Sequence, residues 1–135
     1  MEEWTYVQNT PLDRQLGVSG HYVRICPTPG AGMCGRVEVR DRFGEVVPAE
    51  ALVGLEFMYL ARLGLRRADD RLMLDSLRVA DALLRVETPC GPAYYRYNGD
   101  GYGEHQDGSP FNGTGIGRAW PLLVGERGAP GAPPG

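Results

Sequence analysis

The middle of the chain contains two stretches whose apolar spacing predicts helices. The first begins at Pro48, a favourable first helical residue, and ends at Leu63, with Gly64 as its C-terminal cap. Its apolar positions leave almost no polar face: Leu52, Val53, Leu55, Phe57, Met58, Leu60, Ala61 and Leu63. Because a helix that is apolar nearly all round is buried nearly all round, we expect Pro48–Leu63 to be an inner helix.

The second stretch begins at Asp69 or Asp70, either of which can cap a helix, and ends near Val86, before Pro89. It has an apolar face and a charged face, with ion pairs expected along the charged one. The apolar positions are Met73, Leu77, Ala80 and Leu84, and the charged positions are Asp75, Arg78, Asp81 and Arg85. This pattern predicts an outer helix with a solvated face. An inner and an outer helix together predict an α-hairpin, the unit of helical toroids and solenoids.

The N-terminal third favours short strands. Residues Trp4–Val7 and His21–Ile25 are rich in aromatic and β-branched side chains, and Gly35–Arg40 alternates apolar and charged positions. These segments predict one or two β-hairpins.

The last third favours loop, because glycine and proline concentrate after residue 90. Gly91–Gly117 is expected to be one long irregular loop, and its aromatic residues favour a functional loop over a disordered one. A third helix is expected over Arg118–Val124. Residues 129–135 are expected to form a disordered tail.

Charge and composition exclude several classes of protein. The net charge is −3 and every basic residue is Arg, so no basic excess exists to bind nucleic acid. No run of 18 apolar residues occurs, which argues against a membrane span. The N-terminus is acidic and has no signal peptide, so the chain as given is expected to be cytoplasmic.

The sequence predicts neither a metal site nor a cofactor. Cys26, Cys34 and Cys90 are odd in number and form no closely spaced pair, so neither a disulfide framework nor a zinc site is predicted. The segment from Asn98 resembles a calcium loop, but Ser109 stands where an acidic ligand is needed.

The most informative cluster runs from Tyr94 to Asp100, with Trp120 further along the chain. Aromatic faces bind the C–H surfaces of sugars, and planar polar groups such as those of Arg96 and Asp100 bind pairs of hydroxyls. The alternative is an aromatic cluster that only holds the loop in place. The residues alone favour this alternative.

Three segments resemble one known family. Tyr95–Glu104, Asp107–Leu123 and Gly125–Gly128 are similar to the glucoamylase and glucodextranase family, glycoside hydrolase family fifteen. Weaker similarity extends back to Glu3, so residues 1–128 resemble part of that catalytic domain. The resemblance implies a mainly α fold, part of an (α/α)6 barrel of six inner and six outer helices, with a β-hairpin region and a long glycine-rich loop.

The resemblance also implies an activity and a binding site. The family releases glucose from the non-reducing ends of α-glucans and malto-oligosaccharides, with inversion at the anomeric carbon. Arg96 and Asp100 correspond to residues that contact sugar hydroxyls, and Tyr97 flanks them. Trp120 corresponds to an aromatic residue near the leaving-group sugar.

No catalytic residue is predicted. The family has its general acid in an upstream Trp-Glu-Glu segment and its general base in a downstream Pro-Glu-Gln segment, and this sequence has neither. Glu2 and Glu3 precede Trp4, which is the reverse of the family order. Because each carboxylate contributes about 10²–10⁴-fold, the chain alone is expected to be inactive.

Three hypotheses follow. The chain is the central part of a glucoamylase-type hydrolase, or it is a non-catalytic module that binds carbohydrate or docks on a partner. In the second case the Pro48–Leu63 helix would pack against that partner or a second copy of the chain. The third hypothesis is a degraded gene product that stays partly unfolded and associates through its exposed apolar surface.

Overall fold

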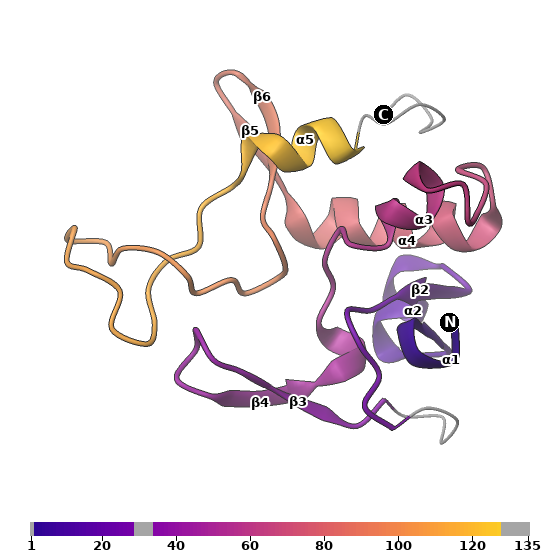
Figure 1. The fold of residues 1–135 in the computed structure, drawn as a ribbon, viewed down its shortest axis with the longest axis horizontal. Helices are drawn as coiled ribbons and strands as arrows, with labels where there is room; N and C mark the ends of the chain where they lie inside the picture. Colours follow the sequence, from indigo (N-terminus) through magenta and orange to yellow (C-terminus); the bar gives the residue numbers. More distant parts are fainter. Residues whose placement is uncertain (1, 29–33, 128–135) are drawn as a thin grey trace.

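A computed structural model describes residues 2–28 and 34–127. Short helices and three two-stranded antiparallel sheets make up these residues, so the described fold is mixed rather than mainly helical (Figure 1). The helices are α1 (Glu2–Thr5), α2 (Pro11–Leu16), η1 (Ala49–Ala51), α3 (Met58–Arg62), α4 (Arg71–Leu84) and α5 (Pro121–Arg127). The strand pairs are β1 (Tyr6–Gln8) with β2 (Gly20–Tyr22), β3 (Arg36–Val39) with β4 (Glu45–Pro48), and β5 (Arg85–Thr88) with β6 (Gly91–Tyr94). The predicted tail, residues 129–135, lies outside the described residues.

Helix α4 is the centre of the largest hydrophobic cluster and confirms the second predicted helix. Asp70 caps it, because its carboxylate accepts a hydrogen bond from the Leu72 amide at 2.9 Å. The predicted apolar face is buried, and it packs against Tyr22 of β2 and Phe57. The helix ends two residues before the predicted Val86, which lies in β5.

The expectation of a solvated charged face on α4 was wrong for Asp75, which is 1% exposed. Its Oδ2 accepts hydrogen bonds from the amide and hydroxyl of Ser19 at 3.1 and 2.5 Å. Its ion pair is with Arg71, at 2.9 Å, rather than with Arg78. The segment before β2 therefore covers this part of α4, which the helical pattern alone does not reveal.

The predicted inner helix Pro48–Leu63 was wrong in conformation and right in burial only for the apolar residues between Leu52 and Met58. Pro48 ends β4, and only α3 at the far end of the stretch is α-helical. Asn98 supplies hydrogen bonds in place of helical ones. Its side-chain oxygen accepts from the Val53 amide at 2.8 Å, and its backbone amide donates to the Val53 carbonyl at 3.2 Å. Leu52, Val53, Leu55, Phe57 and Met58 are nonetheless buried.

This difference also removes the predicted α-hairpin, because α3 is too short to pair with α4 along its length. It changes the predicted self-association surface as well. The large apolar side chains of that stretch that stay exposed lie near its C-terminal end, where Tyr59 and Leu63 are 46% and 69% exposed. Self-association itself stays a prediction.

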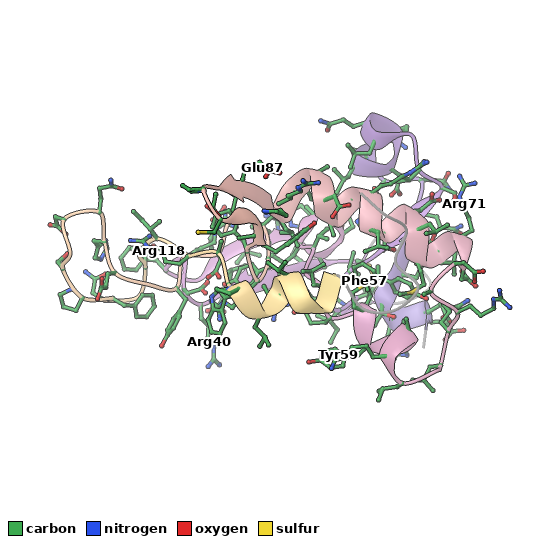
Figure 2. All side chains as sticks on the ribbon, turned by 90° about the horizontal axis from the view of Figure 1, so that it is seen from above. Arg40, Phe57, Tyr59, Arg71, Glu87 and Arg118 are labelled. Atoms are coloured by element: carbon green, nitrogen blue, oxygen red, sulfur yellow. A yellow bond between two sulfur atoms is a disulfide. The ribbon has the colours of Figure 1, made fainter. Side chains whose placement is uncertain are left out.

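The predicted loop over Gly91–Gly117 begins later than expected. Its first four residues form β6, which pairs with β5, and Tyr94 of β6 donates its hydroxyl to Asp81 at 2.8 Å. Beyond β6 the chain projects away from the helices in both views and returns to α5 (Figures 1 and 2). Helix α5 begins three residues later than predicted and packs Leu123 and Val124 against the α4 cluster.

The N-terminal region contains two features that the sequence analysis missed. Helix α2 begins with a capping box, in which Thr10 and Asp13 exchange hydrogen bonds at 3.1 and 2.8 Å. Cys26 and Cys34 form a disulfide, so the prediction of no disulfide was wrong. The strands β1 and β2 each share only two residues with the predicted strands Trp4–Val7 and His21–Ile25, whereas β3 confirms Gly35–Arg40. Among the described residues, no helix is long and apolar enough to cross a bilayer.

Candidate functional site

The candidate site is built around the Arg96 guanidinium, just beyond β6. Asp100 binds it with both carboxylate oxygens, at 2.7 Å from Nε and 2.5 Å from Nη2. This two-point arrangement fixes the plane of the guanidinium and raises the pKa of Arg96, chiefly through the hydrogen bond with Asp100. About a third of the Arg96 side chain, 32%, remains exposed, which leaves the group accessible to a ligand.

Asp100 itself is saturated by the protein. Its side chain is fully buried, and its Oδ1 accepts a further hydrogen bond from the Tyr102 amide at 2.9 Å. Its backbone carbonyl accepts from Gly117 at 3.0 Å, which ties the two ends of the loop together. Asp100 therefore holds Arg96 in place.

Three aromatic rings surround the guanidinium. Its central carbon lies 5.4 Å from the ring centre of Tyr97, 5.1 Å from that of Tyr102 and 5.7 Å from that of Trp120. Such distances allow cation–π attraction. Tyr97 is buried, whereas Tyr102 and Trp120 are 56% and 42% exposed. The structure thus brings together all four residues that the sequence singled out: Arg96, Tyr97, Asp100 and Trp120.

The sequence analysis missed Asp41, which lies in the turn after β3. Its Oδ2 accepts the hydroxyl of Tyr97 and lies 3.4 Å from Nη2 of Arg96. Burial, with a further contribution from this hydrogen bond, raises the pKa of Tyr97. No local signal marks Asp41, because it meets Arg96 across 55 residues of sequence.

The turn between β3 and β4 packs against the loop through close backbone contacts. A Cβ at Gly101 would lie 2.2 Å from the Asp41 carbonyl oxygen, so only glycine permits this approach. The Phe43 amide donates to the Gly113 carbonyl at 3.2 Å, on the other side of the same contact. The glycine-rich loop is therefore packed against the hairpin.

A cavity of about 490 Å³ opens beside this cluster. Its walls include Arg24, Asp41, Leu52, Arg96, Tyr97 and Tyr102. The arrangement combines aromatic faces with a fixed guanidinium, which suits a neutral ligand rich in hydroxyl groups. No group of three or more potential metal ligands gathers in the described part of the chain.

Comparison with known proteins finds a similar sequence and a similar structure, both of glucoamylases. The chain is 38% identical over 128 residues to a glucoamylase of Clostridium sp. (strain G0005). It also superimposes on a crystal structure of a bacterial glucoamylase complexed with acarbose, with a TM-score of 0.77 and 38% identity over 94% of this chain. The chain is therefore similar in sequence and in fold to part of a glucoamylase.

Its match covers only part of those proteins. The chain spans 18% of the length of the Clostridium glucoamylase and 18% of the chain in the acarbose complex. A scan against protein-family models matches none.

Proposed function

We propose that this chain forms part of the sugar-binding wall of a glucoamylase-type hydrolase. The whole enzyme would release glucose from the non-reducing ends of α-glucans with inversion, a reaction that needs two carboxylates about 6.5–9.5 Å apart. In the described residues the two carboxylates of the site, Asp41 and Asp100, both bind Arg96. Neither is available for that chemistry, so the 135 residues alone are not expected to hydrolyse glucan.

The observation that carries this proposal is the fixed, partly exposed Arg96 guanidinium among three aromatic rings. In the proposed site Arg96 donates hydrogen bonds to sugar hydroxyls. Trp120 offers its exposed face to a neighbouring sugar ring. Tyr97 and Asp100 position Arg96, since their polar groups are bound to Asp41 and Arg96 respectively.

We further propose that the chain occupies a segment of an (α/α)6 barrel. The TM-score of 0.77 to a glucoamylase supports this placement, although α4 is the one helix longer than seven residues in the described part of the chain. The remaining barrel helices would then come from residues outside this sequence.

A non-catalytic carbohydrate-binding module is the second candidate, and the same cavity supports it. Titration calorimetry with acarbose, on a chain shown to be folded by circular dichroism, tests sugar binding. Binding that disappears in Arg96→Ala and Trp120→Ala supports the site. A folded chain that does not bind acarbose contradicts both carbohydrate-binding hypotheses and favours a module that docks on a partner protein.

Hydrolysis of maltose distinguishes the hydrolase hypothesis from the hypothesis of a non-catalytic carbohydrate-binding module. The hydrolase reading expects no glucose release from this chain alone. It expects release when the remainder of the Clostridium glucoamylase is supplied as a second polypeptide. A module that binds sugar but never restores turnover to that remainder would favour the non-catalytic reading.

A further inference from the structure

A second guanidinium lines the same cavity as that of Arg96. Arg24, two residues after β2, belongs to the walls of the 490 Å³ cavity, and its side chain is 39% exposed. Its central carbon lies 4.7 Å from the ring centre of Tyr97, and that of Arg96 lies 5.4 Å from the same centre. Two guanidiniums from distant parts of the chain therefore meet at one ring, beside one cavity.

Two contacts fix the Arg24 side chain. One is the Tyr97 ring, and the other is Glu56, which forms an ion pair with Nε of Arg24 at 2.8 Å. Gly54 leaves room for this carboxylate, because an added Cβ would overlap Oε2 of Glu56. Gly54 also pairs with Tyr97 in an antiparallel bridge. One short stretch of backbone thus places both groups that hold Arg24, and a guanidinium that is already fixed loses less freedom when it binds a ligand.

The terminal nitrogens of Arg24 remain available to a ligand. Nη1 and Nη2 have no hydrogen-bond partner among residues 2–28 and 34–127. A guanidinium only donates hydrogen bonds, so the ligand group must accept them. The cavity walls also contain the carboxylates of Glu38 and Asp41, which only accept. Walls with both kinds of group favour a ligand whose groups both accept and donate, as sugar hydroxyls do.

We propose that Arg24 is a second sugar-binding residue, which donates hydrogen bonds from Nη1 and Nη2 to hydroxyls of the oligosaccharide that Arg96 contacts. This inference rests on the proposed sugar-binding function. Ligand pockets measure about 300–1,000 Å³, so the 490 Å³ here can hold a disaccharide. The segment after β2 then contributes to the site together with the loop after β6.

Titration calorimetry with maltose compares Arg24→Gln with a matched control. Arg85→Gln removes an arginine that is 40% exposed and ion-paired with Glu87 at 2.7 Å, but that does not line the cavity. We expect Arg24→Gln to weaken maltose binding about tenfold, because charge-assisted hydrogen bonds are lost. Arg85→Gln should bind maltose as the wild-type chain does. Equal maltose affinity in the two variants overturns the inference, while loss of binding in Arg96→Ala keeps the proposed function.

Arg24→Lys distinguishes a sugar contact from mere support of the Tyr97 ring. Lysine keeps the positive charge and the cation–π attraction to the ring, but it lacks the planar fork with two terminal donors. We therefore expect Arg24→Lys to bind maltose at least about fivefold more weakly than the wild-type chain. A lysine that restores wild-type affinity would show that Arg24 only supports the ring, and would overturn the inference.

Two measurements on the wild-type chain do not depend on how a variant folds. With arginine labelled with ¹⁵N, maltose should shift the Nε signals of Arg24 and Arg96 and leave that of Arg85 unchanged. A shift of the Arg96 signal without the Arg24 signal overturns the inference and keeps the proposed function. Inorganic phosphate should not compete with maltose, and competition would assign the guanidiniums to an anion instead. If the folded wild-type chain binds no sugar, the proposed function fails and the inference fails with it.

Discussion

The Asp13 carboxylate lies 2.6 Å from Nδ1 of His21, and both side chains are buried. The other ring nitrogen of His21, Nε2, lies 3.0 Å from the Glu50 carbonyl oxygen, which can only accept a hydrogen bond. The pair therefore joins α2, β2 and η1 at a buried point of the fold.

Removing one member of this pair should be strongly destabilising. We expect Asp13→Ala to lower the free energy of unfolding by about 3–5 kcal/mol, because it leaves Nδ1 of His21 without its partner and removes the hydrogen bond from the Thr10 amide to the Asp13 carboxylate, one half of the α2 capping box. Urea denaturation monitored by circular dichroism measures the change. Asp69→Ala removes an exposed carboxylate and should leave stability unchanged. Equal stability of both variants would contradict a structural role for the pair.

Acid should destabilise the fold partly through Asp75. Burial acts to raise its pKa, but the hydrogen bonds from Ser19 and the ion pair with Arg71 outweigh burial and lower the pKa below its usual 3.8. The ionised group therefore stabilises the fold above that value, and the stabilisation is lost as pH falls through the lowered pKa.

The free energy of unfolding, measured between pH 5 and pH 2, should accordingly fall more steeply for the wild-type chain than for Asp75→Asn. Glu104→Gln, an exposed change in the loop, should follow the wild-type curve. Parallel curves for all three proteins would show that Asp75 has the same pKa in the folded and unfolded chains.

The disulfide between Cys26 and Cys34 closes a short loop, with a sequence separation of 8. Loop-closure entropy predicts that replacing both cysteines by serine lowers stability by about 2.5 kcal/mol. Cys90→Ser is the control, because Cys90 is an exposed free thiol. The thermal midpoint with and without reductant checks the result: reductant should lower it in the wild-type chain and leave the double variant unchanged.

Gly101→Ala should separate the β3–β4 turn from the loop, because the added Cβ would overlap the Asp41 carbonyl. We expect sugar affinity to fall at least about tenfold, since Asp41 would no longer reach Tyr97 and Arg96. Gly125→Ala adds the same methyl group where nothing lies within 4 Å and is the control. Unchanged acarbose affinity in Gly101→Ala would show that this contact does not shape the site.

Local patterns predicted some elements well. Helix α4 follows from its apolar spacing and the cap at Asp70, both of which lie within the segment itself. The stretch from Leu52 to Met58 could not be predicted in the same way, because Asn98 supplies its hydrogen bonds from 45 residues away. The burial of this stretch was predicted correctly because burial follows from its apolar composition. Its conformation was not, because it depends on a partner that is distant in sequence.

The residues of the candidate site likewise differ in how far apart they lie in the sequence. Arg96, Asp100 and Tyr97 lie within a few residues of one another, so the sequence could group them. Asp41 joins them only when the β3–β4 turn packs onto the loop. Its neighbours Arg40 and Arg42 gave no hint of this, since a charged turn between two strands is ordinary.

The tight backbone crossings of the loop constrain how this segment can diverge. At Gly101, Gly103, Gly115 and Gly117 an added methyl group would lie within 2.5 Å of a backbone oxygen. Substitutions at these four positions should therefore be rare among related sequences, while Gly125, with open space around it, should vary freely. Many glycines of the loop are therefore required by close backbone contacts. Variation among related sequences should distinguish these glycines from those that have open space around them.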